Sequence, residues 1–132
     1  MAEPIIVVVE DDRDTLEYME MLLSWKGYVP IGSSTVDGVP SLIREVNPAL
    51  VILDLELEQP DSGITLLRTL HSDPASETLP AILYSAHEYG LMAYRDELRA
   101  LHCAMLRKPF LPDEMFELIK TQLATQPYPV LP

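Results

Sequence analysis

Cysteine and basic residues are scarce in this sequence. A single cysteine, Cys103, occurs among 132 residues, which excludes an internal disulfide and favours a reducing cytosolic environment. This residue is expected to be a small buried hydrophobic side chain. Lys and Arg number 9 against 21 Asp and Glu, so the formal net charge is −12. Because such a charge repels phosphate backbones, we expect no direct binding of nucleic acid.

Long apolar runs and an N-terminal positive charge are also missing. A membrane-spanning helix needs roughly 20 apolar residues in a row, and the sequence has no run of that length. Glu3 and Pro4 stand where a secretory signal would carry positive charge. The sequence therefore predicts a cytoplasmic chain that has no signal peptide and does not bind membranes. It contains no internal repeat, and 132 residues suffice for one domain with a buried core.

Short apolar runs alternate with helical patterns along the chain. Apolar runs bounded by turn residues predict buried strands at residues 5–9, 28–31, 50–54, 79–84 and 103–106. Apolar residues at helical spacing predict helices at residues 14–26, 40–46, 63–70, 89–101 and 112–124. Three prolines in the last seven residues predict a tail or linker remnant over residues 125–132, after a domain over residues 1–124.

Five strands that alternate with five helices predict an α/β fold. The expected architecture is a doubly wound, three-layer sandwich around a five-stranded parallel sheet. In such sheets, ligands bind beyond the carboxyl ends of the strands. Polar residues follow or end four of the predicted strands, namely Glu10, Asp11, Asp54, Ser85 and Lys108. We expect these residues to converge at one edge of the sheet and to form a site there.

Carboxylates gathered at one edge predict a bound cation. Two carboxylates about 4 Å apart repel each other by roughly 4 kcal/mol at an effective dielectric constant near 20. A hard divalent cation relieves the repulsion, and Mg²⁺ favours one or two carboxylates together with water and a phosphate oxygen. A lone aspartate after a strand is more often a turn or capping residue, so the interpretation of Asp54 depends on its neighbours.

Four segments resemble the motifs of bacterial response-regulator receiver domains, the phosphoacceptor modules of two-component signalling. The segments are residues 7–12 (VVVEDD), 50–54 (LVILD), 83–86 (LYSA) and 108–110 (KPF). Each motif is weak alone, but Asp11, Asp54, Ser85 and Lys108 follow one another at intervals of 43, 31 and 23 residues. The resemblance extends over residues 4–124 and implies a flavodoxin-like sandwich.

The resemblance implies a phosphoacceptor function. Mg²⁺ would be held, directly or through water, by Glu10, Asp11, Asp54 and the backbone carbonyl of Glu56. Asp54 would take a phosphoryl group from the phosphohistidine of a sensor histidine kinase or a phosphotransfer protein. The domain would be no enzyme in the usual sense, because it would catalyse only its own phosphoryl transfer and autodephosphorylation.

Two further residues complete the implied machinery. Lys108 would neutralise the phosphoryl oxygens during transfer, and Ser85 would donate its hydroxyl to the phosphoryl group. The resemblance also implies a cis peptide bond between Lys108 and Pro109, as is frequent in the family.

The sequence departs from the family pattern at several positions. The segment between Asp54 and Gly63 is one residue longer than usual, and Leu101 replaces the glycine usual before the last strand. Glu56 and His87 occupy positions that influence phosphoryl lifetime in the family. Met105 stands where an aromatic switch residue is typical, so phosphorylation is expected to be read out in another way, or weakly.

An apolar region near the fourth helix predicts a partner surface. Tyr89, Met92 and Met105 contribute to it. Phosphorylation would bias the face made by the fourth helix, the fifth strand and the fifth helix between two arrangements. A downstream effector, a fused output domain or a second copy of the chain would bind that face.

Two alternatives come from other functional classes. A degenerate receiver would act as a phosphorylation-independent interaction module, although the main acidic and basic positions are all present. A Mg²⁺-dependent phosphohydrolase also uses an aspartate nucleophile on a parallel sheet, but Glu56 stands where its second aspartate is expected. The sequence also leaves open whether the chain acts alone or is a piece of a longer protein.

Overall fold

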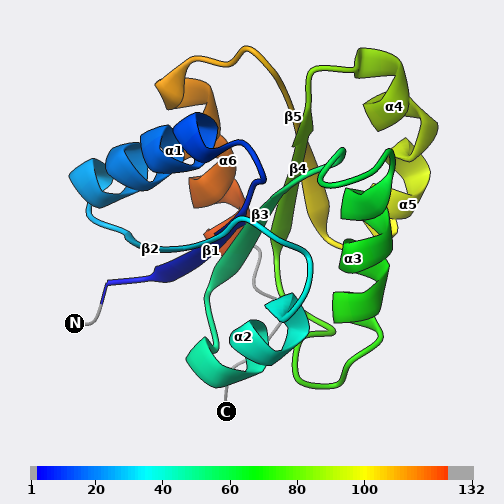
Figure 1. Ribbon diagram of the computed structural model, residues 1–132, viewed down its shortest axis with the longest axis horizontal. Helices are drawn as coiled ribbons and strands as arrows, with labels where there is room; N and C mark the ends of the chain where they lie inside the picture. The colour runs from blue at the N-terminus through cyan, green and yellow to red at the C-terminus, as the bar shows by residue number, and fades with distance from the viewer. Residues whose placement is uncertain (1–2, 125–132) are drawn as a thin grey trace.

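Five parallel strands form the sheet of the computed structural model, which describes residues 3–124 (Figure 1). The strands are β1 (Ile5–Val9), β2 (Val29–Ser33), β3 (Leu50–Asp54), β4 (Ala81–Ser85) and β5 (Cys103–Arg107). Their order across the sheet is β2-β1-β3-β4-β5, and all neighbouring strands are parallel. The order reverses between β1 and β3, so the predicted doubly wound, flavodoxin-like sheet is confirmed.

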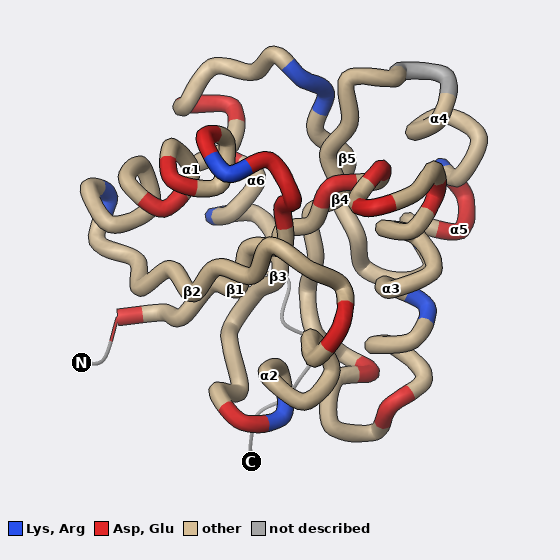
Figure 2. Tube along the Cα trace, in the orientation of Figure 1, with Lys and Arg blue, Asp and Glu red and all other residues tan. Residues whose placement is uncertain are grey.

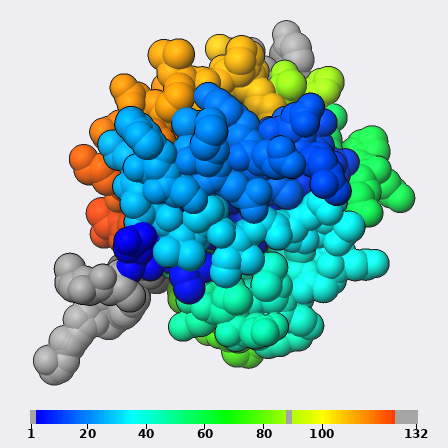
Figure 3. All heavy atoms as spheres, turned by 60° about the vertical axis from the view of Figure 1, so that its left-hand side comes forward, coloured from blue at the N-terminus to red at the C-terminus, as the bar shows by residue number. Residues whose placement is uncertain are grey.

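The helices form one layer on each face of this sheet (Figure 1). On one face lie α1 (Arg13–Lys26) and α6 (Pro112–Ala124), and α1 dominates the surface seen in Figure 3. The other face is covered by α2 (Val39–Val46), α3 (Ser62–His71), α4 (Glu88–Ala93) and α5 (Arg95–Ala100). The three-layer sandwich predicted from the sequence is therefore present.

The strands divide their side chains between the two helix layers. In β1, Ile6 and Val8 pack toward α1 and α6, whereas Val7 and Val9 pack toward α2 and α3. All residues of β3 and β4 are buried. Burial on both faces explains why these strands appear in the sequence as continuous apolar runs rather than as alternating patterns.

The caps of α1 fix the connection that carries the first acidic residues. The Asp12 carboxylate accepts a hydrogen bond from the backbone N–H of Thr15 at 3.0 Å, so Asp12 is the N-cap. Gly27 ends the helix in the left-handed region, with φ of 99°. Trp25, near this end, is 78% exposed on the outer surface. Because α1 begins at Arg13, the connection from β1 consists only of residues 10–12, which include Glu10 and Asp11.

The single helix predicted over residues 89–101 is wrong, because the chain forms α4 and α5 with a break at Tyr94. The N–H of Tyr94 donates to the carbonyl of Leu91 at 3.2 Å, so α4 ends in a tight turn. The Arg68 guanidinium of α3 lies 5.7 Å from the centre of the Tyr94 ring and 2.5 Å from the Glu97 carboxylate of α5. Contacts of Arg68 in α3 therefore hold the residue at the break and the helix that follows it.

Some predictions fall outside the described residues. The tail predicted over residues 125–132 is one of them, and the side chain of Tyr89 is another. Among residues 3–124, no helix is long and apolar enough to cross a membrane. Cys103 is only 8% exposed, and burial raises the pKa of its thiol to about 12. This agrees with its expected place in the core.

Gln122 fixes α6 to the sheet and allows a test of stability. Its buried amide donates hydrogen bonds to the carbonyl oxygens of Ala81 at 2.8 Å and His102 at 2.6 Å. In Gln122→Leu these acceptors lose that donor, so we expect the free energy of unfolding in urea to fall by about 1–3 kcal/mol. Thr121→Ala, at an exposed site on the same helix, is the control and should change it by less than about 0.5 kcal/mol. Equal losses in the two variants would contradict this account.

Candidate functional site

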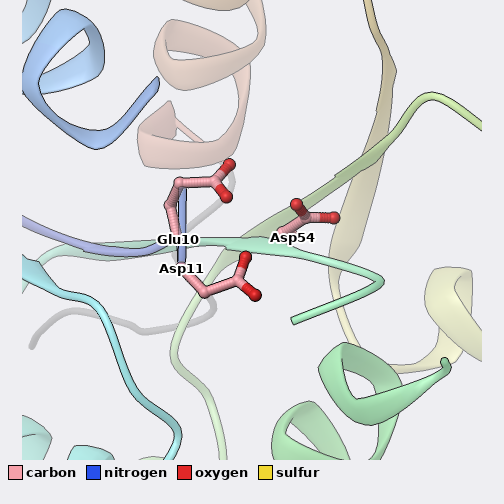
Figure 4. A group of neighbouring side chains, drawn as sticks. All are labelled: Glu10, Asp11 and Asp54. Atoms are coloured by element: carbon pink, nitrogen blue, oxygen red, sulfur yellow. The ribbon is translucent and has the colours of Figure 1, made fainter. Parts of the chain in front are cut away.

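Three carboxylates meet at the carboxyl edge of the sheet (Figure 4). Glu10 and Asp11 directly follow β1, and Asp54 is the last residue of the adjacent strand β3. One oxygen of each residue lies within 4.8 Å of the others. Glu10 and Asp54 are only 1% and 6% exposed, whereas Asp11 is exposed. Acidic residues gather around this edge (Figure 2). The fold thus brings together three of the acids singled out in the sequence, at a spacing that one divalent cation can span.

Lys108 reaches the acidic cluster from the loop after β5. Its ammonium nitrogen Nζ lies 3.0 Å from Asp54 Oδ2 and 3.3 Å from Glu10 Oε1. The peptide bond between Lys108 and Pro109 is cis, which confirms that expectation. One ammonium thus faces three carboxylates, and the remaining negative charge favours the binding of a cation.

Burial affects the protonation of two carboxylates of the cluster, Asp54 and Asp11. It raises the pKa of Asp54, while the backbone N–H of Glu56, 2.9 Å from Oδ1, and the Lys108 ammonium act in the opposite direction. The pKa of Asp11 is also raised, first by burial and then by hydrogen bonding with Glu10. Ionisation of Asp54 is thus opposed by the loss of hydration in a buried site, whereas Asp11 lies on the exposed side of the cluster.

Glu10 is held by donors on both of its oxygens. Oε2 accepts a hydrogen bond from the backbone N–H of Asp12 at 3.0 Å. Oε1 accepts a hydrogen bond from the hydroxyl of Tyr84, which lies buried in β4. Burial, reinforced by the Glu10 charge, raises the pKa of the Tyr84 phenol well above its usual range, so the hydroxyl remains a donor. The sequence alone does not point to Tyr84, because a tyrosine within an apolar run cannot be told from any other core residue.

Ser85 is joined to two residues that lie outside the acidic cluster. Its hydroxyl donates to Glu56 Oε1 at 3.0 Å and accepts from the backbone N–H of His87 at 2.9 Å. The other Glu56 oxygen lies 3.3 Å from His87 Nε2. The Glu56 side chain is therefore directed toward Ser85, and the suggested role of its backbone carbonyl as a metal ligand stays a prediction.

The suggested partner surface is partly formed by exposed side chains. Met92 is 50% exposed, and Met105 is partly buried against the core. Together with Leu91 and Arg107 they line a shallow pocket beside β5. The binding role suggested for Tyr89, Met92 and Met105 stays a prediction.

Comparisons with known proteins identify the family. The chain matches the model of the response regulator receiver domain over residues 6–120. It is similar to Response regulator Rre1 of Synechocystis sp., with 32% identity over 130 residues that cover 96% of this chain and 54% of that protein. It thus spans about half the length of this relative. It is also similar to the polar-differentiation response regulator DivK of Brucella ovis, with 25% identity over 89% of this chain and 94% of that protein.

Solved structures share the fold. The non-phosphorylated HemR receiver domain from Leptospira biflexa has a TM-score of 0.81 at 24% identity and covers 98% of this chain and 100% of that one. A CheY-like response regulator receiver domain protein from Methanospirillum hungatei JF-1 has a TM-score of 0.79 at 21% identity, covering 94% of this chain and 96% of that one. Since the family model spans residues 6–120, nearly the whole of the described fold, the chain belongs to the response regulator receiver domain family.

Proposed function

We propose that this domain is a phosphoacceptor of a two-component phosphorelay. Asp54 takes a phosphoryl group from a sensor histidine kinase or a phosphotransfer protein, Mg²⁺ assists the transfer, and a partner-binding face responds. One observation carries the proposal: Asp54 meets two further carboxylates and the Lys108 ammonium at the carboxyl edge of the sheet. The same edge is where ligands bind in doubly wound folds.

The donor atoms of the site fit Mg²⁺. Carboxylate oxygens are hard ligands, and those of Glu10, Asp11 and Asp54 lie within reach of one ion. Glu10, Asp11 and Asp54 would hold the ion, directly or through water, and the backbone carbonyl of Glu56 would add a ligand. When bound, Mg²⁺ supplies positive charge to the phosphoryl oxygens.

Asp54 is the nucleophile in this proposal. Its carboxylate oxygen attacks the phosphorus of the phosphohistidine, a P–O bond forms, and the P–N bond breaks on the opposite side. The electron pair of the broken bond leaves with the imidazole nitrogen, which takes a proton from solvent. Lys108 Nζ, 3.0 Å from Asp54 Oδ2, neutralises oxygens of the incoming phosphoryl group.

Ser85 links phosphorylation to the partner-binding face. Its hydroxyl donates to Glu56 in the structure described here, and a phosphoryl group on Asp54 is a more highly charged acceptor that competes for it. The exchange shifts the end of β4 and the start of α4, and so biases the face formed by α4, α5, β5 and α6 between two arrangements. A downstream effector, a fused output domain or a second copy of the chain then reads the change on this face, at Tyr89, Met92 and Met105.

Incubation with acetyl phosphate, a small acyl phosphate donor, tests the function. In the presence of Mg²⁺ we expect the intact mass to increase by one phosphoryl group, because Asp54 is held beside a cation site and an ammonium group. In EDTA the increase should disappear, and hydroxylamine should remove the label, as expected of an acyl phosphate. Absence of any label at saturating donor and Mg²⁺ would favour the degenerate receiver instead.

A further inference from the structure

Tyr84 makes three contacts beside the proposed phosphoacceptor site. It is fully buried, and its hydroxyl donates to Glu10 Oε1. The Lys108 ammonium lies 4.4 Å from the centre of its ring, a distance typical of a cation–π interaction. The ring of Phe110 packs edge-on against it, with centroids 6.4 Å apart and an interplanar angle of 83°. The tyrosine thus contacts both members of the Glu10–Lys108 ion pair.

The hydroxyl of Tyr84 and the ammonium of Lys108 share one acceptor. Both approach Glu10 Oε1, but Lys108 Nζ lies closer to Asp54 Oδ2, at 3.0 Å, than to Glu10, at 3.3 Å. Glu10 is almost fully buried, so its carboxylate needs hydrogen-bond donors from the protein in place of water. The Tyr84 hydroxyl is one such donor, and its hydrogen bond weakens the attraction between the Glu10 carboxylate and the Lys108 ammonium.

We propose that Tyr84 is a positioning residue that keeps the Lys108 ammonium on Asp54 rather than on Glu10. Its hydroxyl satisfies Glu10 Oε1, and its ring holds the ammonium over the cluster. This inference rests on the proposed function, since it concerns the rate at which Asp54 accepts a phosphoryl group. Tyr84 touches no reacting atom and acts only through Lys108 and Glu10.

Tyr84→Phe separates this role from simple packing, because the ring and its contacts with Lys108 and Phe110 remain. Without the hydroxyl, Glu10 Oε1 draws Lys108 away from Asp54. We expect the rate of labelling by acetyl phosphate at saturating Mg²⁺ to fall about tenfold, the factor that one hydrogen bond to a charged group is worth. The Mg²⁺ concentration for half-saturation, measured by calorimetry in the absence of acetyl phosphate, should change by less than about threefold. A change of about tenfold would instead indicate that the lost hydrogen bond acts on Mg²⁺ binding through Glu10.

A crystal structure determined without Mg²⁺ and without acetyl phosphate tests the position of Lys108 independently of the labelling rate. In a crystal structure of metal-free Tyr84→Phe, Lys108 Nζ should lie closer to Glu10 Oε1 than to Asp54 Oδ2, the reverse of the present order. Tyr28→Phe makes the same chemical change away from the site and is the matched control, with an unchanged labelling rate. Urea denaturation of both variants checks that each remains folded.

The possible outcomes separate the inference from the proposed function. If the wild type is labelled and Tyr84→Phe is labelled equally fast, the inference is wrong although the function stands. If Tyr84→Phe binds Mg²⁺ more weakly but is labelled at the wild-type rate at saturating Mg²⁺, Tyr84 acts only on Glu10 and not on Lys108. That result would also contradict the inference. If the wild type is not labelled at all, the proposed function fails, and the position of Lys108 in the metal-free variant still decides whether Tyr84 directs it.

Discussion

Asp54→Asn is expected to lose phosphoryl labelling completely. The carboxylate that would attack phosphorus is replaced by an amide, which is neither charged nor nucleophilic at neutral pH. With Mg²⁺ and acetyl phosphate, the intact mass of the variant should stay that of the unmodified chain, whereas the wild type gains one phosphoryl group. Asp61→Asn makes the same chemical change at the exposed N-cap of α3 and should be labelled at the wild-type rate. Labelling of Asp54→Asn to the wild-type extent would place the acceptor elsewhere.

The same variant should remain folded. Burial raises the pKa of Asp54 in the folded protein above its value in the unfolded chain, so its ionisation weakens folding as the pH rises through the folded pKa. In EDTA at neutral pH, Asp54→Asn removes this unfavourable charge, while Lys108 keeps its contact with Glu10. We therefore expect a midpoint of urea denaturation at or above that of the wild type, and loss of labelling cannot then be attributed to unfolding.

Gly63→Ala is expected to destabilise the domain strongly. A β-carbon at this position would lie 2.1 Å from the carbonyl oxygen of Asp54 and 2.7 Å from the Cα atom of Leu55. Both obstacles are backbone, so no side chain can rotate away. We expect the free energy of unfolding, measured in urea, to fall by about 3 kcal/mol or more, the upper part of the range for overpacked sites. Glycine-to-alanine changes inside helices are otherwise stabilising, so steric overlap decides the sign.

The Gly63 substitution also connects stability with the site. The N–H of Gly63 donates to the carbonyl of Leu55 at 2.8 Å. This hydrogen bond joins the start of α3 to the residue that follows Asp54. Any shift that relieves the overlap displaces the end of β3, and folded Gly63→Ala should be labelled more slowly than the wild type. Thr65→Ala, at an exposed site two residues further along α3, is the matched control and should change stability by less than about 0.5 kcal/mol. A Gly63→Ala variant as stable as Thr65→Ala would contradict the steric argument.

The sequence was sufficient to predict the sheet and the meeting of the charged residues. Continuous apolar runs mark strands buried on both faces, and parallel strands bring their carboxyl ends to one edge. From these two rules, the proximity of Asp54 and Lys108, 54 residues apart, could be expected before any coordinates. Asp12, the N-cap of α1, is a local feature of the kind that a sequence can indicate, because an N-cap depends only on neighbouring residues.

Contacts between distant side chains could not be predicted in this way. The hydrogen bond between Tyr84 and Glu10 joins residues 74 positions apart, and that between Ser85 and Glu56 joins residues 29 positions apart. Neither is implied by periodicity or strand order, since both depend on which rotamer each side chain adopts in the packed site. The break at Tyr94 was missed for a similar reason: Arg68 and Glu97, which brace it, belong to different helices.

A departure from the family pattern proved informative about the backbone. Leu101 replaces the usual glycine before the last strand, yet the residue with left-handed geometry is its neighbour His102, with φ of 54°. The carbonyl of His102 accepts hydrogen bonds from Gln122 and from the N–H of Ala81. These bonds hold a conformation that glycine would adopt without help, and a sequence pattern alone does not reveal such compensation.

The deep burial of Cys103 makes the protein a convenient subject for spectroscopy. With a thiol pKa of about 12, the native cysteine is almost entirely unionised at neutral pH and reacts slowly with maleimides and iodoacetamides. A cysteine introduced at an exposed position such as Met92 would then carry a fluorophore or spin label by itself, without removal of the native one. Movements of the α4 and β5 surface can be followed in the otherwise unaltered chain.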